Sequence, residues 1–410
     1  MTNIFAYEAE MQEWLSNALK DVDGLGDLIS NIETISEAVA SNSSDERLLE
    51  SFRVCIKSLH ITHVMSENEN ISVNDQDILK PDFLLYAPET ESVVIVELKN
   101  LEQTTRQAGT EISAYACEVR SSVPFIADGD MVSVIVSPFW PTLLKHHVRQ
   151  EILWQGRNVI CLRPVSVDND VRLEILDPSE LRDDALELRV PPEYLGGYQI
   201  CLYDDELYSQ SPDKTRLDKY MEQFKTALNA MASTGARLNS HGFAFLWRDR
   251  WELSLAPYSI TTINFAPFQS VERFLHVEGG SLPRLFEQLR AVIREYCPMG
   301  HGEALSNISR SADPFLQAVC SPRYEGFMHW GGHRSILTSR ADLVAFVAWG
   351  RFQQLYYDRL SREYEAGNIT VSSADPEIGL EIVDQVIDNT YEFVDLTCAG
   401  MDDEDDEDKS

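Results

Sequence analysis

Two carboxylates and a lysine at strand-like spacing are the residues of this sequence best suited to chemistry. They lie in the stretch Pro81-Asp82-Phe-Leu-Leu-Tyr-Ala-Pro-Glu-Thr-Glu-Ser-Val-Val-Ile-Val-Glu97-Leu98-Lys99. Apolar runs at 83–86 and 93–96 flank a polar turn, which is the pattern of a β-hairpin. If the turn lies at the midpoint, Asp82 and Glu97 face each other with Cβ atoms roughly 4.5–5.5 Å apart. Lys99 lies two residues beyond Glu97 and therefore points to the same face.

Two like charges held opposite each other destabilise a sheet unless a cation compensates them. A divalent metal ion is the natural candidate, and Mg²⁺ prefers hard oxygen ligands such as these carboxylates. A metal ion can lower the pKa of water and neutralise charge that develops on a phosphate. A nearby lysine adds positive charge to the same transition state. The residues therefore suit phosphodiester hydrolysis.

The Pro-Asp pair, the hairpin-length gap and Glu-Leu-Lys together resemble the PD-(D/E)XK nuclease superfamily, which has the restriction-endonuclease-like fold. The resemblance implies that Asp82 and Glu97 hold Mg²⁺ (or Mn²⁺) and that the Leu98 carbonyl contributes. It implies that Lys99 orients the attacking water and helps to deprotonate it. The resemblance covers roughly residues 1–165.

An upstream helix is expected over residues 4–20, because its apolar residues recur at helical spacing. Glu8 lies on the otherwise apolar face of this helix. Many members of the superfamily place a glutamate of the first helix in the metal site, so Glu8 is our candidate and Glu10 the alternative. Both could instead be surface carboxylates that the helix dipole favours near an N-terminus.

The helix expected at 103–119 follows Lys99 in the sequence. In RecB-like members of the superfamily this helix carries Gln-x-x-x-Tyr, which contacts the site and the nucleic acid. Here Tyr115 has the place of the tyrosine, but Glu111 stands where glutamine is expected. Gln107, one turn earlier, is the candidate for the glutamine. Tyr115 either contacts nucleic acid or is a core aromatic.

The superfamily core runs helix, three strands, helix, strand, and this chain can supply that order. A buried strand is expected at Met131–Val136, followed by a helix at 141–153 and a further strand at Asn158–Leu162. We therefore predict an α/β fold with a restriction-endonuclease-like mixed sheet flanked by helices.

The length of 410 residues predicts two or three domains. We assign a nuclease-like domain to 1–165, a linker to 166–210, an α+β domain for substrate or partner recognition to 211–398, and an acidic disordered tail to 399–410. In the second half we expect helices near 213–231, 282–297, 336–366 and 376–394, and strands near 242–247 and 260–265.

The net charge of −33 opposes simple binding of a polyanion, because phosphate contacts normally require a basic surface. The segment from Arg237 to Arg351 differs, since it holds twelve arginines and ten acidic residues. Arg323 and Arg334 lie there among aromatic residues and are our candidates for nucleic-acid binding. Their alternative role is to pair with local carboxylates.

Seven scattered cysteines without a Cys-x-x-Cys pair indicate reduced thiols. No run of 18 apolar residues is present, and the first residues do not resemble a signal peptide. We therefore expect a cytoplasmic protein that has no membrane partner.

These observations predict a Mg²⁺-dependent nuclease that acts on DNA, with RNA as the alternative substrate. An acidic nuclease is expected to work with a protein partner or as a homo-oligomer. Bacterial and phage-defence proteins offer an analogy, because many carry this fold beside an unfamiliar domain. The alternative function is a non-catalytic interaction protein with a nuclease-like fold, whose acidic surface binds a basic protein or mimics nucleic acid.

Overall fold

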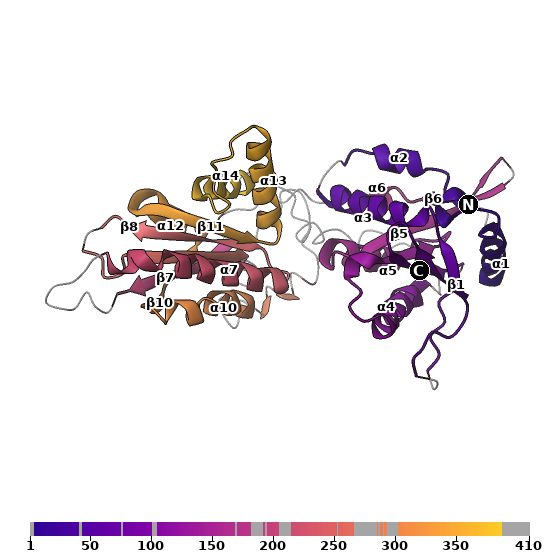
Figure 1. Ribbon diagram of the computed structural model, residues 1–410, viewed down its shortest axis with the longest axis horizontal. Coiled ribbons are helices and arrows are strands. Elements are labelled where there is room, and N and C mark those ends of the chain that lie inside the picture. Colours follow the sequence, from indigo (N-terminus) through magenta and orange to yellow (C-terminus); the bar gives the residue numbers. More distant parts are fainter. Residues whose placement is uncertain are drawn as a thin grey trace. The chain divides into compact units, whose positions relative to one another are not determined.

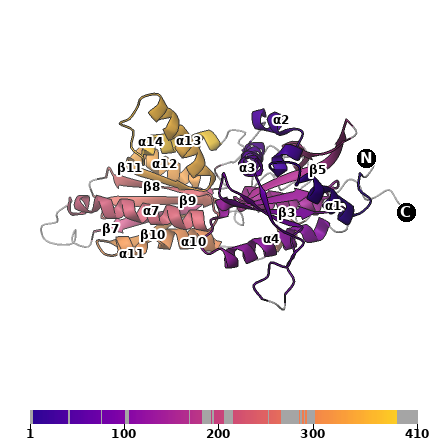
Figure 2. The same cartoon turned by 45° about the vertical axis from the view of Figure 1, so that its right-hand side comes forward.

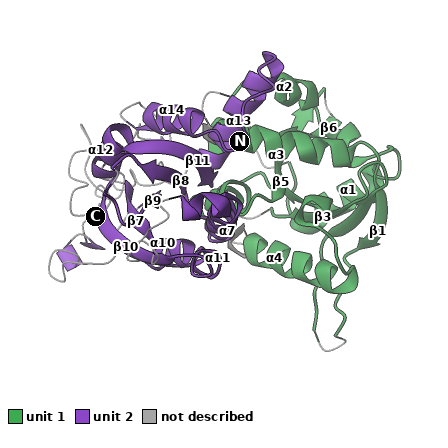
Figure 3. Cartoon of the chain, turned by 60° about the vertical axis from the view of Figure 1, so that its left-hand side comes forward, with its two compact units in different colours: residues 1–185 green, residues 186–410 purple. Residues whose placement is uncertain are grey.

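The computed structural model of the protein describes residues 4–40, 43–74, 77–100, 105–168, 170–181, 195–204, 215–251, 253–265 and 302–387, with a few isolated positions between them. The chain forms two compact units, residues 1–185 and 186–410 (Figure 3). The acidic tail predicted at 399–410 lies outside the described residues. Within the described part of the chain, no helix is both long and apolar enough to cross a membrane.

The first unit alternates helices and strands (Figure 1). Its elements are α1 (Glu8–Ala18), η1 (Leu25–Leu28), α2 (Ile32–Glu37), α3 (Ser43–Leu59), β1 (His63–Glu67), β2 (Phe83–Ala87), β3 (Ser92–Leu98), α4 (Thr105–Ser122), η2 (Asp128–Asp130), β4 (Met131–Val136), α5 (Thr142–Arg149), η3 (Gln150–Trp154), β5 (Asn158–Val167), β6 (Asp170–Ile175) and α6 (Pro178–Leu181).

One mixed six-stranded sheet, in the order β1-β2-β3-β4-β5-β6, organises this unit. β3 runs parallel to β4 and β4 to β5, while the other neighbouring strands are antiparallel. The central strand β3 is buried along its whole length, which agrees with its run of β-branched residues. The α/β class and the mixed sheet that we predicted are therefore confirmed.

Helices cover both faces of the first sheet. α3 packs on β5 and β4 and α4 packs on β3 and β4, and the two helices lie on opposite sides of the sheet (Figure 2). Under α4, Leu84 and Ile95 contact Tyr115 and Val119. Alternate residues of β2 and β3 therefore face two different layers, as the two-residue period of a strand requires.

The second unit contains a five-stranded antiparallel sheet in the order β10-β7-β9-β8-β11. Its elements are β7 (Leu195–Tyr203), η6 (Arg216–Tyr220), α7 (Met221–Arg237), β8 (Gly242–Asp249), β9 (Tyr258–Phe265), α10 (Gly302–Arg310), α11 (Asp313–Leu316), β10 (Ser321–His329), α12 (Trp330–Arg340), β11 (Ala341–Trp349), α13 (Arg351–Glu365) and α14 (Pro376–Val386).

Two separate cores stabilise the second unit, one on each face of its sheet. Phe243, Phe245 and Trp247 of β8 pack against α12, α13 and α14. The intervening Ala244 and Leu246 face the other way and pack against α7, α10 and α11. β8 is therefore hydrophobic from Phe243 to Trp247 because both of its faces are covered there.

The helix predicted over 336–366 is wrong, because β11 lies in its middle. Residues 341–349 alternate between the two cores and pair with β8. Gly350 then turns the chain into α13 with a φ of +60°, and a Cβ there would lie 2.2 Å from Nδ1 of His241. Only glycine tolerates this turn, and a single apolar run could not reveal the change of element.

The predicted linker at 166–210 also differs from the structure, because it contains two strands. β6 forms a hairpin with β5 and so extends the first unit beyond residue 165. β7 lies inside the second sheet, where Gly197 approaches β9 so closely that a Cβ would lie 1.9 Å from the Thr262 carbonyl oxygen. The glycine pair of β7 resembles a loop in the sequence but reflects close packing of strands.

A buried histidine makes the stability of the second unit depend on pH. Nε2 of His333 donates to the Gly197 carbonyl oxygen at 3.0 Å, while its buried Nδ1 has no hydrogen-bond partner. Burial lowers the pKa of His333 to about 4. The native state therefore binds fewer protons than the unfolded state below pH about 6.5, and stability falls as the pH falls towards 4.

We expect this histidine to reduce the free energy of unfolding by about 2 kcal/mol between pH 7 and pH 5. His333→Gln keeps a donor for Gly197 but does not titrate, so this part of the pH dependence should disappear. Urea denaturation of both proteins at the two pH values measures the difference. Equal pH dependence in the two proteins would contradict the prediction.

Candidate active site

The predicted hairpin and its register are confirmed by the structure. Phe83 pairs with Val96 and Leu84 with Ile95, so the next residues outward, Asp82 and Glu97, lie opposite each other. Asp82 Oδ2 accepts a hydrogen bond from the backbone N–H of Leu98 at 2.7 Å. This bond fixes the Asp82 carboxylate against the end of β3.

Lys99 joins the two sides of the site. Its Nζ contacts Glu97 Oε1 and lies 2.9 Å from Glu111 Oε2 of α4. Lys99 and Glu97 are both buried, whereas the Glu111 side chain is 35% exposed. The ammonium group is thus held between a strand carboxylate and a helix carboxylate.

Burial of these charges shifts their protonation equilibria. Burial raises the pKa of Asp82, and the negative charges of Glu8 and Glu111 add to the effect. Burial and then the charge of Asp82 raise the pKa of Glu97. Burial alone would lower the pKa of Lys99, but the neighbouring carboxylates outweigh it and raise that pKa above its ordinary value. Three carboxyl groups therefore crowd one lysine, and the pKa of Glu97, raised to about 9, means that this carboxyl keeps its proton at neutral pH unless a cation replaces it.

The N-terminal helix α1 packs on β3 and brings Glu8 towards this site, where its negative charge raises the pKa of Asp82 and of Lys99. Asn100, directly after Lys99, donates from Nδ2 to the Phe5 carbonyl oxygen at 3.0 Å and ties the start of this helix to the end of β3. Glu10, the alternative, instead accepts a hydrogen bond from the backbone N–H of Ala6 at 2.6 Å. Glu10 therefore bonds to the backbone just before its own helix.

Glu111 is the residue whose role sequence reasoning missed. Its place in Gln-x-x-x-Tyr identified it only as a departure from the pattern, whereas the structure pairs it with Lys99. The negative charge of Glu111 could have indicated this role, because a carboxylate on the helix that follows a buried lysine is a natural ion-pair partner. Gln107, proposed in its stead, has a side chain outside the described part of the structure.

Tyr115 takes the position of a core aromatic. Its side chain is buried among Leu84, Val93 and Ile95, and its hydroxyl donates to the Lys80 carbonyl oxygen at 3.0 Å. Burial and nearby carboxylates raise its pKa, so the hydroxyl stays protonated. Because Lys80 precedes Pro81-Asp82, this bond helps to position Asp82 rather than offering a surface for nucleic acid.

Arg323 and Arg334 do not form one basic surface. Arg323 lies on the edge strand β10 and stacks over the ring of Tyr203 at 4.6 Å. Arg334 forms two hydrogen bonds of 2.7 Å with Asp384 of α14, which packs on β11 at the opposite edge of the sheet. For Arg334 the alternative of pairing with a local carboxylate is what the structure shows.

The donors at the hairpin fit a divalent cation. Glu97 Oε2 is buried and has no hydrogen-bond partner, and a cation there would displace the proton that the raised pKa of Glu97 keeps on this carboxyl group. Among the described residues, no three His, Cys, Asp or Glu side chains form a metal-binding group. The available set is therefore the two carboxylates of Asp82 and Glu97 with the Leu98 carbonyl oxygen, and Mg²⁺ commonly completes so small a set with water.

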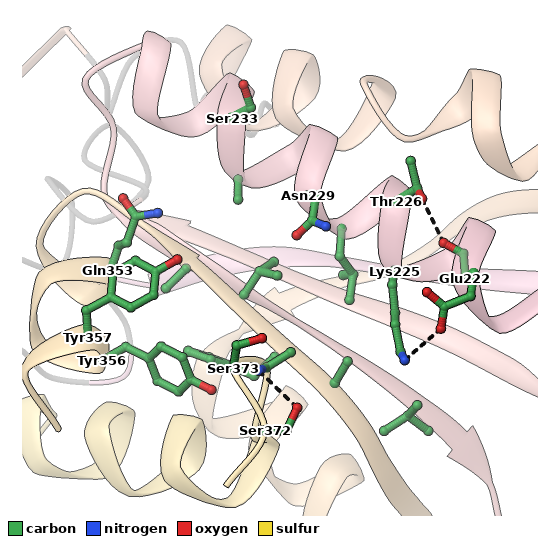
Figure 4. Close-up of a pocket in the computed structure, with 18 residues that line it drawn as sticks. Glu222, Lys225, Thr226, Asn229, Ser233, Gln353, Tyr356, Tyr357, Ser372 and Ser373 are labelled. Carbon is green, nitrogen blue, oxygen red and sulfur yellow. Dashed lines mark hydrogen bonds and ion pairs between the residues drawn. The ribbon is translucent and has the colours of Figure 1, made fainter. Parts of the chain in front are cut away.

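A cavity of about 550 Å³ in the second unit offers no comparable chemistry. α7 forms one wall and α13 the other, with β11 between them (Figure 4). Its charged residues, Glu222 and Lys225, bond to each other at 2.9 Å. The other labelled residues carry neutral polar groups, which suit hydrogen bonding, and no second carboxylate that could help Glu222 to hold a metal ion.

Removing the partly buried charge of Asp82 should stabilise the metal-free protein. Asp82→Asn keeps the size and one acceptor oxygen, and we expect it to raise the free energy of unfolding by on the order of 1–2 kcal/mol at pH 7. Mg²⁺ should raise the unfolding temperature of the wild-type protein but not of the variant. Thermal unfolding with and without Mg²⁺ measures both effects.

Asp21→Asn is the matched control, because Asp21 is an exposed carboxylate of the same unit. It should leave both the stability and the response to Mg²⁺ unchanged. A Mg²⁺ response of Asp82→Asn equal to that of the wild-type protein would show that the cation does not bind at Asp82.

Comparison with known proteins identifies no relative. No protein-family model, no curated protein and no solved structure matches this chain. The function must therefore be argued from the residues of the site.

Proposed function

We propose that the chain is a Mg²⁺-dependent (or Mn²⁺-dependent) nuclease of the PD-(D/E)XK type that hydrolyses phosphodiester bonds in DNA. The observation that carries the proposal is the convergence of the Asp82 and Glu97 carboxyl groups beside Lys99, in surroundings that raise the pKa of both and so disfavour their negative charge. Such charge is unfavourable in the sheet without a cation. The order α3, β1, β2, β3, α4, β4 supports the proposal, because it agrees with the element order of that superfamily.

Asp82, Glu97 and the Leu98 carbonyl oxygen would hold the cation, and Glu8 assists by adding negative charge nearby. When bound, the cation would lower the pKa of water and neutralise charge on the phosphate. Lys99 stays protonated between Glu97 and Glu111. It therefore acts as a positive charge that orients water and stabilises the developing oxyanion, and not as the proton acceptor.

One observation favours the alternative function, which is that of a non-catalytic interaction protein. The first unit holds 32 acidic and 14 basic residues, a net charge of −18. A non-catalytic protein with this surface would bind a basic partner or mimic nucleic acid. A nuclease with the same charge needs cations or a basic partner to bring DNA to the site. The nuclease assay separates these functions.

Cleavage should require the proposed residues. With Mg²⁺ or Mn²⁺, we expect the protein to cut at least one of linear, circular or single-stranded DNA. Asp82→Ala and Lys99→Ala should each lower the rate by about 100-fold or more. Gel assays of all three DNA forms and of RNA measure this.

Lys57→Ala, which removes an exposed lysine of the same unit, should retain full activity. Cleavage that survives both substitutions at the site would contradict the residue assignment. No cleavage of any substrate would favour the non-catalytic function.

Glu111 should tune the affinity for the cation without being essential. Glu111→Gln removes one negative charge and keeps the size of the side chain. We expect half-maximal cleavage to require about three- to tenfold more Mg²⁺, because one nearby charge contributes on the order of 1 kcal/mol. The maximal rate at saturating Mg²⁺ should change less than about threefold. A titration of the rate with Mg²⁺ measures both, and loss of cleavage at saturation would contradict a purely electrostatic role.

A further inference from the structure

Phe125 combines full exposure with a strained backbone. It follows α4, its side chain is fully exposed, and its φ is +71°. The turn from Val123 to Ile126 is closed by a 3.3 Å hydrogen bond from the Ile126 N–H to the Val123 carbonyl oxygen. Pro124 is second in this turn, and the third position, where φ is positive, normally holds glycine or asparagine.

Neither burial nor turn geometry explains a phenylalanine at this position. A bulky side chain in the left-handed region costs roughly 1–2 kcal/mol, and an exposed ring gains nothing from the core. Strained residues and exposed aromatic rings both concentrate at binding surfaces. Phe125 therefore points to a contact with another molecule.

An apolar groove of about 590 Å³ lies beside this ring. Its lining includes Met65, Tyr86 and Val123, which are respectively 56%, 37% and 45% exposed. Tyr86 lies four residues along β2 from Asp82, about 13 Å away. The groove is therefore distinct from the candidate active site.

The charges around the groove indicate what it binds. Glu91 and Asp130, which we call its rim residues, are exposed carboxylates of the lining, and the described lining residues include one exposed histidine, His63, but no lysine or arginine. The first unit has a net charge of −18. Nucleic acid, an anionic membrane and a second copy of this chain would all be repelled. A basic protein segment has the complementary charge.

The geometry of the edge strand β1 indicates that a partner binds here by inserting a side chain into the groove and not by pairing with β1 as an additional strand. The pairing of β1 with β2 shifts between Val64 and Ser66, so that Met65 is bulged out. A bulge on an edge strand hinders pairing with another strand and redirects a side chain. Here it places Met65 in the lining of the groove.

We propose that this groove, defined by Met65, Tyr86, Val123, Phe125 and Ile126 with the rim residues Glu91 and Asp130, binds a basic segment of a partner protein. The segment inserts one large apolar side chain against Phe125, while its lysines or arginines approach the two rim carboxylates. Central aromatic contacts of this kind carry most of the binding energy in many interfaces. The inference does not depend on the proposed nuclease function.

The test uses a fluorescent peptide, Lys-Lys-Leu-Trp-Leu-Lys-Lys, and the full chain. Two control peptides replace either the lysines by glutamates or the apolar residues by serines. Fluorescence anisotropy should show binding of the first peptide only. Phe125→Gly should weaken this binding by about tenfold or more and should raise the unfolding temperature, because it relieves backbone strain.

Val39→Gly is the matched control, since Val39 is an exposed apolar residue of the same unit that does not line the groove. It should bind the peptide as the wild-type protein does. Equal peptide binding by the wild-type protein and Phe125→Gly, or no binding by either, would overturn the proposal. So would a dimer in sedimentation analysis that Phe125→Gly dissociates, because the occupant would then be a second copy. A lower unfolding temperature of Phe125→Gly would show that Phe125 has a structural role.

Discussion

The crowding of two facing carboxylates, one buried and one partly buried, beside one buried lysine is the constraint on which the candidate site depends. Asp82 and Glu97 lie at paired ends of β2 and β3, and Lys99 is shared between Glu97 and Glu111. Like charges in a poorly solvated place cost free energy unless hydrogen bonds or a cation compensate them. The Leu98 N–H and Lys99 compensate in part, and the unpaired Glu97 Oε2 shows where compensation is incomplete.

The surrounding elements of the fold hold these charged residues in place. The parallel pairing of β3 with β4 buries the strand that carries Glu97, and α4 supplies both Glu111 and the Tyr115 hydroxyl that holds the chain before Asp82. Asn100 fastens the start of the N-terminal helix, so that Glu8 contributes its charge. Charges from three separate elements, α1, β3 and α4, therefore act on one lysine.

The sequence could predict the hairpin register because the side chains of a strand alternate with a fixed period of two residues. The midpoint of the turn then determines every cross-strand residue pair. It could not predict that Glu111 bonds to Lys99, because that contact depends on how α4 packs on the sheet. The helix predicted across 336–366 failed for a related reason. The apolar run of β11 suits a buried helix as well as a strand that is covered on both faces, and only its pairing with β8 distinguishes them. The roles predicted for Arg323 and Arg334 rested on composition, which does not reveal local partners such as Asp384.

The most direct test of the central claim is a crystal structure of the protein with Mn²⁺, in which anomalous scattering locates the ion. We expect one ion bonded to carboxylate oxygens of both Asp82 and Glu97 and to the Leu98 carbonyl oxygen, with Lys99 still paired with Glu111. An ion bound elsewhere, or no ion at saturating Mn²⁺, would contradict the claim that the buried carboxylates of this hairpin form a metal site.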